Sequence, residues 1–192
     1  AVIIVRKNIT LSNESSANYA TISGSAVNHQ YSKSFEFEKD FRNYYAKYIS
    51  EDFNYFSFLR PLNEMQIAKL FSGLTKYHSV FRSCNQGSKT DSWCGCCPKC
   101  LFTAIILLPF LDREKLTQLL NKDILDDISL RRIFDQLIGL AETKPFECVG
   151  TIDEVNSAII IYLSAHDKDL PALLSYYKET KNYLRYLKFN PD

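Results

Sequence analysis

The fold of this chain is decided by one short stretch, Cys84-Asn-Gln-Gly-Ser-Lys-Thr-Asp-Ser-Trp-Cys94-Gly-Cys96-Cys97-Pro-Lys-Cys100, which holds five of the six cysteines. A soft divalent metal needs four deprotonated sulfur or imidazole ligands on a short, sharply turned backbone. The two-residue spacings within the stretch supply such turns, and Gly95 permits the tightest of them. We therefore predict a four-cysteine zinc site that leaves Cys96 spare and consists of Cys84, Cys94, Cys97 and Cys100.

A disulfide cluster is the alternative for these cysteines. Five cysteines in one loop cannot pair evenly, and the remainder of the chain has the character of an intracellular protein, which favours a metal. A site with four protein ligands keeps no open position for a substrate. We therefore expect the zinc to stabilise the fold and to take no part in chemistry.

The residues before the cysteines alternate between predicted strands and helices. The β-branched run Val2–Val5 predicts a buried parallel strand, and Phe56–Arg60 and Tyr77–Arg82 predict two more. Helices are predicted at 34–49, capped by Ser34 and with its aromatic stripe in the core, and at 63–73, capped by Asn63. This alternation is typical of an α/β fold with a parallel sheet.

After the cysteines the chain is predicted to be helical throughout. The predicted helices are Lys99–Leu111, Arg113–Leu120, Leu130–Leu140, Ile152–Ala165 and Pro171–Leu187. Thr151 and Glu154 form a capping box, and His166 is placed as a C-terminal cap. We predict three parts: 1–83, a zinc loop at 84–100, and a helical region at 101–192.

Composition excludes several classes of protein. The net charge is +1, so no strong field favours nucleic acid or an anionic membrane. The longest apolar run, Leu101–Leu111, is too short to span a bilayer. The chain has no initiator methionine and no signal peptide at its start, so we expect a cytoplasmic protein and a piece of a longer one. Its oligomeric state is left open.

Polar residues after the first predicted strand are candidates for ligand binding. Asn13, Glu14 and Ser16 lie where ligands bind in open α/β sheets, although a turn that caps a helix is the alternative. Lys33 ends the polar run Asn28–Lys33 and can serve as a point charge for phosphate or carboxylate. His29 lies in the same run, which would otherwise be an ordinary solvated loop.

Several separated motifs resemble one family of enzymes. The zinc loop is similar to that of the 7-cyano-7-deazaguanine synthases, which are PP-loop ATP pyrophosphatases. The stretches at 12–18, 27–38, 93–100 and 144–150 together resemble the ATP-dependent UDP-N-acetylmuramoyl-L-alanyl-L-glutamate epimerases of peptidoglycan synthesis. Ser15 stands where related sequences tend to carry arginine, and no Ser-Gly-Gly loop for ATP pyrophosphate occurs in the chain.

The resemblance implies a fold, a reaction and cofactors. The fold would be part of a doubly wound parallel sheet of the adenine nucleotide alpha hydrolase type, with residues 1–83 as a nucleotide-binding part. The reaction would turn the terminal L-Glu of UDP-MurNAc-L-Ala-L-Glu into D-Glu with ATP and Mg²⁺. Asn13, Glu14, Ser16 and Lys33 would border the nucleotide. The alternatives are another PP-loop amidating or ligating enzyme, or a zinc-stapled module that binds nucleic acid.

An epimerase must remove a proton from one face of a carbon atom and return one to the other face. Cys148 and Glu147, in the Lys144–Gly150 motif, and His29 are the candidates for this proton transfer. An isolated cysteine is more often a small buried hydrophobic residue, which is the alternative for Cys148.

Overall fold

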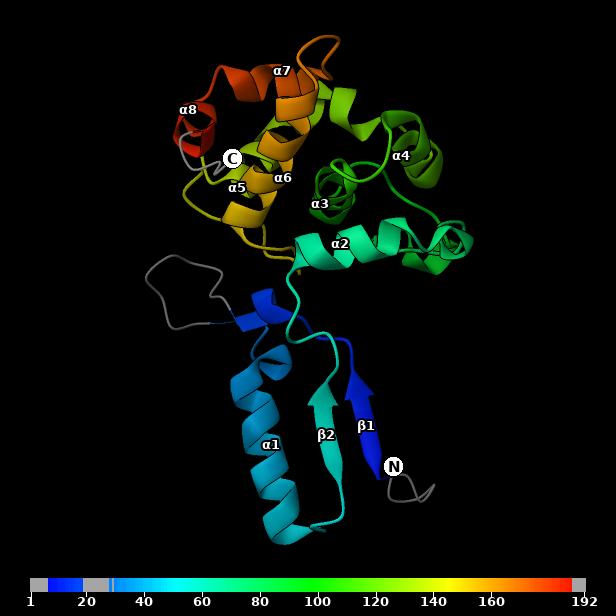
Figure 1. Cartoon of the computed structure of the whole chain (residues 1–192), viewed down its shortest axis with the longest axis vertical. Coiled ribbons are helices and arrows are strands. Elements are labelled where there is room, and N and C mark those ends of the chain that lie inside the picture. Colours follow the sequence, from blue (N-terminus) through cyan, green and yellow to red (C-terminus); the bar gives the residue numbers. More distant parts are fainter. Residues whose placement is uncertain (1–6, 19–27, 29, 188–192) are drawn as a thin grey trace. The chain divides into compact units, whose positions relative to one another are not determined.

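The computed structural model of this protein describes residues 7–18, 28 and 30–187. The chain separates into two compact units, Ala1–Ile67 and Ala68–Asp192, and each is described by itself (Figure 1). The predicted strand Val2–Val5 and the candidate His29 lie outside the described residues. The three-part division with a boundary at 83/84 stays a prediction.

The first unit contains a strand-helix-strand motif (Figure 1). Strands β1 (Asn8–Leu11) and β2 (Asn54–Ser57) run parallel, in a register that pairs Asn8 with Asn54 and Leu11 with Ser57. Helix α1 (Phe35–Tyr48) connects them and packs on β2. The predicted parallel pairing is present, and in the described part of the chain the sheet has two strands. A larger doubly wound sheet stays a prediction.

Helix α1 begins at its predicted cap, but fewer of its aromatic side chains are buried than predicted. The Ser34 hydroxyl accepts a hydrogen bond from the Phe37 N–H at 3.1 Å. One face packs its rings on the strand region, with Phe41 and Tyr45 lying 4.6 Å and 4.0 Å from the rings of Tyr55 and Phe53. On the other face Tyr44 and Tyr48 are 58% and 63% exposed. A helix over a two-stranded sheet can cover it with one face only, so the prediction of an all-core aromatic stripe was wrong for these two tyrosines.

Two of the predicted strands need correction. Strand β2 occupies Asn54–Ser57, so it begins two residues before the predicted Phe56 and ends well before Arg60. The predicted strand Tyr77–Arg82 is wrong, because the chain there forms a short 3₁₀ turn, Thr75–Tyr77, followed by a helical turn. The rings of His78 and Phe81 both pack on Phe71, a contact that three-residue spacing on a helical turn allows and an extended strand does not.

Helix α2 (Glu64–Ser72) carries the chain from the first unit into the second. Its start is a reciprocal cap: Asn63 Oδ1 accepts from the Gln66 N–H at 2.9 Å, and Gln66 Oε1 accepts from the Asn63 N–H at 3.0 Å. Because two backbone donors find partners in this way, the predicted cap at Asn63 is confirmed. The helix ends before Gly73, as predicted.

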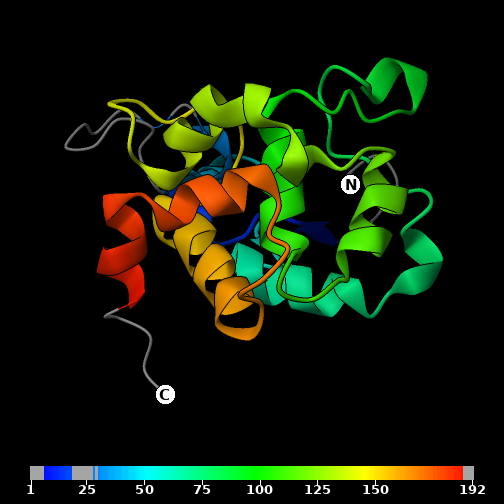
Figure 2. The same ribbon diagram turned by 90° about the horizontal axis from the view of Figure 1, so that it is seen from above.

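The second unit is a helical assembly around α3 (Figures 1 and 2). Its helices are α3 (Pro98–Leu107), α4 (Arg113–Leu120), α5 (Arg131–Ile138), α6 (Ile152–Ala165), α7 (Ala172–Lys178) and α8 (Lys181–Leu187). Helix α3 is buried over nearly its whole length and packs against α4, α5 and α6. The predicted helical C-terminal region is therefore confirmed. No helix among the described residues is long and apolar enough to cross a membrane.

The predicted bounds were right for helices α4 and α6, and the caps of α6 are formed by residues close together in the sequence. The capping box of Thr151 and Glu154 is present. His166 ends α6 as predicted, with Nδ1 3.0 Å from the Tyr162 carbonyl oxygen. Helix α5 (Arg131–Ile138) is an exception, because it begins one residue after and ends two residues before the predicted bounds Leu130–Leu140. Its C-cap is Gly139, whose φ of +78° lies in the left-handed region and ends the helix there.

Two other predicted helices also differ in length from the prediction. Helix α3 ends at Leu107, four residues before the predicted end. The predicted helix Pro171–Leu187 is two helices, because the chain turns at Thr180. The Thr180 hydroxyl donates to the Tyr177 carbonyl at 2.7 Å, a local bond that competes with helix continuation.

Candidate metal centre and polar site

The structure brings the four predicted cysteines together. The sulfur atoms of Cys84, Cys94, Cys97 and Cys100 all lie within 4.8 Å of one another. Three of the separations are 3.8 Å for Cys84–Cys97, 3.7 Å for Cys94–Cys100 and 3.5 Å for Cys97–Cys100. Four sulfurs at the Zn–S distance of about 2.3 Å lie about 3.8 Å apart on a tetrahedron. The group therefore has the donors and the spacing that could hold a metal ion.

The loop before α3 is shaped to present these sulfurs. Gly95 adopts φ +67°, as the predicted tight turn requires. Cys97 is the N-cap of α3 and Pro98 its first residue, which directs Cys100 back toward the other sulfurs. Gly87 has no room for a side chain, since an added Cβ would lie 1.9 Å from the Ser92 carbonyl oxygen.

Hydrogen bonds to the sulfur atoms affect how readily these thiols lose their protons. The N–H groups of Gly87 and Cys94 donate to Cys84 Sγ at 3.1 Å and 3.4 Å, which stabilises a thiolate. Hydrogen bonding to Cys100 lowers the pKa of Cys97 to about 7, and the same contact raises the pKa of Cys100. Cys96 is exposed and does not belong to the four-sulfur group.

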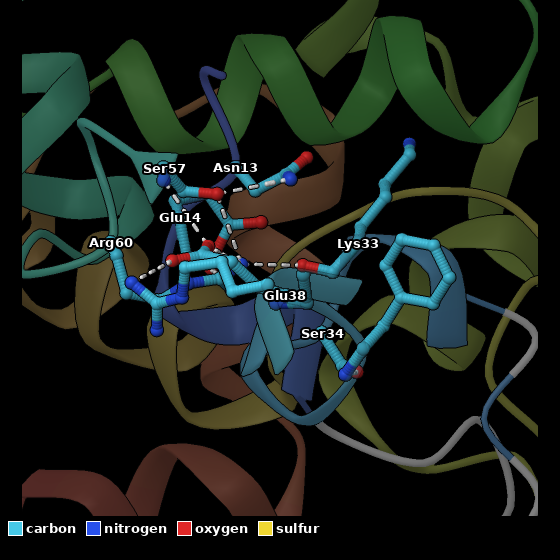
Figure 3. A network of polar contacts seen from close by, with 10 residues as sticks. Asn13, Glu14, Lys33, Ser34, Glu38, Ser57 and Arg60 are labelled. Carbon is cyan, nitrogen blue, oxygen red and sulfur yellow. Dashed lines mark hydrogen bonds and ion pairs between the residues drawn. The ribbon is translucent and has the colours of Figure 1, made fainter. Parts of the chain in front are cut away.

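A polar network lies just beyond the carboxyl ends of β1 and β2 (Figure 3). At its centre is Arg60, whose side chain is 14% exposed. Its Nη1 donates to the Glu14 carbonyl at 2.8 Å, and its Nη2 donates to the Lys33 carbonyl at 2.7 Å. Nη2 also lies 3.3 Å from Glu38 Oε2 and 3.2 Å from Ser57 Oγ. One guanidinium thus ties together the loops that follow β1 and precede α1.

The carboxylate of Glu38 balances this charge from the first turn of α1. Glu38 is 4% exposed, and its Oε2 accepts the Ser57 N–H at 3.1 Å. Arg42 contributes a second, weaker contact at 3.7 Å. Breaking such a buried pair by removing one partner costs about 3–5 kcal/mol. The network therefore fixes the backbone around the strand ends.

Three of the predicted nucleotide residues lie in this region. The amide of Asn13 donates to Ser57 Oγ at 3.2 Å, across the two strand ends (Figure 3). The carboxylate of Glu14 accepts from the hydroxyl and N–H of Ser16 and from the Ala17 N–H. Glu14 is therefore a cap for the short 3₁₀ helix Ser15–Asn18, which is what the turn alternative expected of it.

The fourth predicted residue enters the network through its backbone. Lys33 offers its carbonyl oxygen to Arg60, while its exposed side chain extends away from the guanidinium (Figure 3). The adjacent Asn28 links the loops, with its amide donating to the Ala17 carbonyl at 2.9 Å. The structure thus places the loops of Asn13 and Lys33 side by side.

Sequence reasoning missed the residues that hold this region together: Glu38, Ser57 and Arg60. In the sequence, Arg60 marks only the end of a predicted strand. A weak signal was available, because Arg60 is a lone cation directly before a proline at a strand end.

The Lys144–Gly150 motif forms a closed loop between α5 and α6. Lys144 Nζ donates to the Val149 carbonyl at 2.9 Å. An added Cβ at Gly150 would lie 2.8 Å from Glu154 Oε2 and 2.9 Å from the Phe102 ring, so a larger residue there would force these side chains to shift. The loop is therefore fixed at both of its ends.

Two of the candidates for proton transfer lie in this loop. Glu147 Oε2 is buried with no hydrogen-bond partner among the described residues. Cys148 is half-buried. Both belong to the second unit, whereas the polar network belongs to the first.

Comparison with known proteins gives one consistent result. The model of the MurL C-terminal domain matches residues 80–184, and that of the MurL N-terminal domain matches residues 1–58. No solved structure matches.

Three curated relatives carry the name UDP-N-acetyl-alpha-D-muramoyl-L-alanyl-L-glutamate epimerase. The protein of Xanthomonas oryzae pv. oryzae is 37% identical over 164 residues, which cover 81% of this chain and 36% of the relative. The protein of a Micromonospora species is 37% identical over 152 residues, which cover 76% of this chain and 34% of the relative. The protein of Salinispora tropica is 38% identical over 152 residues, which cover 76% of this chain and 33% of the relative. This chain thus spans about a third of the length of its relatives. By the match to the C-terminal domain model over residues 80–184, the chain belongs to the MurL epimerase family.

Proposed function

We propose that this chain is part of an ATP-dependent epimerase, which converts the terminal L-Glu of UDP-MurNAc-L-Ala-L-Glu to D-Glu in the cytoplasm. The observation that carries the proposal is the 37–38% identity to three proteins named as epimerases of this dipeptide nucleotide. Because the chain spans about a third of those relatives, we expect the 192 residues alone to be inactive.

The chemistry gives a reason for the use of ATP. A Cα hydrogen beside an ionised carboxylate is a very weak acid. Attack of an oxygen of the glutamyl α-carboxylate on the α-phosphorus of ATP releases pyrophosphate and gives an acyl adenylate, in which the former carboxylate carbon bears an uncharged carbonyl. Its carbonyl accepts the electron pair when a base removes the Cα proton, and protonation on the opposite face inverts the centre. Water then releases the D-glutamyl carboxylate and AMP.

The polar network of the first unit is our candidate for the nucleotide side of this reaction. We assign Asn13, Glu14, Ser16 and Lys33 to the border of the ATP site. The support is their position at the carboxyl ends of parallel strands, where open α/β folds bind ligands. Mg²⁺ would be bound together with ATP and would neutralise part of the charge of its phosphates. We also propose that β1 and β2 belong to a larger doubly wound sheet of the PP-loop type.

The four cysteines are our candidate for a structural zinc site. The support is an all-thiolate donor set at tetrahedral spacing, which suits Zn²⁺ better than the oxygen-seeking Mg²⁺. Cys84, Cys94, Cys97 and Cys100 would hold the ion, and its role would be to hold the loop before α3 in place.

Three residues are our candidates for proton transfer. We propose Cys148 and His29 as the proton carriers, with Glu147 as the next candidate. A buried carboxylate oxygen that finds no hydrogen-bond partner in the described part of the chain, as in Glu147, supports a role in contact with substrate or a proton. The other two readings of the chain, an amidating PP-loop enzyme and a nucleic-acid-binding zinc module, are less favoured because the three relatives are all named as epimerases.

Isotope exchange tests the reaction. The full-length enzyme, with ATP, Mg²⁺ and the L-glutamate dipeptide nucleotide in D₂O, should exchange the glutamyl Cα hydrogen and release AMP and pyrophosphate. Omission of ATP should abolish the exchange. Exchange at an equal rate without ATP would refute the activation step.

Two cysteine variants test the proton carrier. Cys148→Ser should slow epimerisation about 10²-fold or more while ATP consumption persists, because a hydroxyl is a far weaker acid than a thiol. Cys96→Ser, which changes the exposed thiol outside the four-sulfur group, is the matched control and should leave the rate unchanged. If Cys148→Ser and His29→Gln both epimerise at the wild-type rate, neither residue carries the proton.

A pair of asparagines tests the nucleotide site. Asn13→Ala removes a cross-strand hydrogen bond at the carboxyl end of the strands and should weaken ATP binding about tenfold. Asn54→Ala removes a similar bond, 2.9 Å to Asn8 Oδ1, at the other end of the strands and should leave ATP affinity unchanged. Calorimetry on the full-length enzyme measures both. Unchanged ATP affinity with a lowered melting temperature in Asn13→Ala would favour the turn alternative.

A further inference from the structure

The second unit contains a hollow of about 440 Å³ beside the first turn after α2. Its lining comes from two segments. His78, Ser79 and Arg82 line one part, and Lys115, Gln118 and Asn121 of α4 and its C-terminal turn line another. Among the described residues that line it, Leu119 is the one aliphatic hydrophobic side chain. The volume is typical of a small-molecule site, but the lining is far more polar than usual.

The charges of this hollow have one sign. Arg82 and Lys115 contribute two positive charges, and no described carboxylate belongs to the lining. The carboxylates that pair with them lie outside it: Asp91 is 3.3 Å from Arg82, and Asp112 is 2.8 Å from Lys115. These two aspartates are 81% and 75% exposed, and exposed pairs contribute about 0–1 kcal/mol. An incoming anion could therefore displace them at little cost.

The donors of the hollow are partly fixed in place. Arg82 donates from Nη1 to the Phe81 carbonyl at 2.7 Å and from Nε to the Asp91 carbonyl at 3.0 Å, which orients the guanidinium. His78 Nε2 lies 3.1 Å from the Phe71 carbonyl oxygen. A carbonyl can only accept, so this nitrogen carries the proton and the ring is oriented. Preoriented donors lose less entropy when a ligand binds.

We propose that this hollow binds the diphosphate group of a nucleotide. A diphosphate offers several acceptor oxygens and at least two negative charges, which match the guanidinium, the ammonium and the amide and hydroxyl donors of the lining. The inference rests on the proposed function, in which two diphosphate sources occur: the uridine diphosphate of the substrate, and the polyphosphate of ATP with its pyrophosphate product.

Calorimetric titration of the 192-residue chain with pyrophosphate, UDP and ADP tests the site. Lys115→Ala should weaken binding about tenfold or more, because a charge-assisted hydrogen bond is lost. Lys178→Ala is the matched control, since Lys178 pairs with Asp167 at 2.6 Å on α7 and does not line the hollow. Asp112→Asn should tighten binding, because the carboxylate that competes for Lys115 is removed. Thermal melting of each variant confirms that it is folded.

The outcomes separate cleanly. Tighter binding of UDP than of ADP assigns the hollow to the nucleotide sugar, and tighter binding of ADP or pyrophosphate than of UDP assigns it to ATP and its product. Equal binding of all three supports a diphosphate site that does not recognise the base. Absence of binding, or equal weakening by Lys115→Ala and Lys178→Ala, would overturn the proposal. The assay involves no turnover, so its failure leaves the epimerase proposal standing. A failure of isotope exchange would leave diphosphate binding by the hollow intact and remove only its link to the epimerase reaction.

Discussion

Two neighbouring cysteines provide a sharp test of the metal centre. Cys97 is 1% exposed, and its sulfur lies 3.8 Å and 3.5 Å from those of Cys84 and Cys100. Cys96 is adjacent in sequence but exposed, and does not belong to the four-sulfur group. Cys97→Ser should therefore release zinc, whereas Cys96→Ser should retain it.

The size of the effect follows from linkage between binding and folding. A site that forms only in the folded state stabilises that state by about 4.1 kcal/mol when free zinc is at 1,000 times its Kd. In a unit of the size of Ala68–Asp192, each kcal/mol changes the melting temperature by roughly 4 °C. Complete loss of zinc should therefore lower the melting temperature by about 16 °C.

The assay combines metal content with thermal unfolding. Elemental analysis of purified protein should find about one zinc for each chain in the parent and in Cys96→Ser, and little in Cys97→Ser. A chelator should lower the melting temperature of the first two proteins to that of Cys97→Ser, and leave Cys97→Ser unchanged. The ligand assignment is refuted if Cys96→Ser releases zinc while Cys97→Ser retains it.

Three further predictions concern stability of the second unit. Gly87→Ala should lower the melting temperature, because the added Cβ would lie 1.9 Å from the main-chain oxygen of Ser92. Gly73→Ala should leave the melting temperature unchanged, because the added Cβ would lie 3.6 Å from the main-chain oxygen of Leu70, an ordinary contact distance. Asn156→Ala should lower the free energy of unfolding, measured in urea, by about 3 kcal/mol. The fully buried amide of Asn156 donates hydrogen bonds to two carbonyl oxygens and accepts one from a tyrosine hydroxyl, and the variant loses all three. Asp127, hydrogen-bonded first to Lys122, has its pKa lowered from 3.8 to about 2. Its contribution is therefore complete above about pH 4 and lost as the pH falls toward 2, and the pH dependence of melting in that range should flatten in Asp127→Asn.

The sequence by itself determined the features that depend on near neighbours in the chain. The spacing of Cys84, Cys94, Cys97 and Cys100 was enough to predict the four-sulfur group that the structure contains. The capping box at Thr151 also followed from spacing, because its hydrogen bonds join residues three apart. The family motifs are likewise read from short stretches. In each case the partners are close in sequence, so their geometry is encoded locally.

The tertiary structure alone decided which distant residues meet. Arg60 contacts Glu14, Lys33 and Glu38, which lie up to 46 positions away, and no periodicity in the sequence encodes that meeting. It also decided that Tyr44 faces outward while Tyr45 is buried, because burial depends on what packs against each face of α1.

The same holds for the segment after α2 and for the hollow of the second unit. Residues 77–82 have the composition of a strand, but the rings of His78 and Phe81 bind to Phe71 only if the chain turns helically. That turn brings Arg82 to the same hollow as Lys115, which lies 33 positions further along the chain. Local hydrogen bonds are encoded by spacing along the chain, whereas a cluster of charges forms only where the packed backbone returns to the same place.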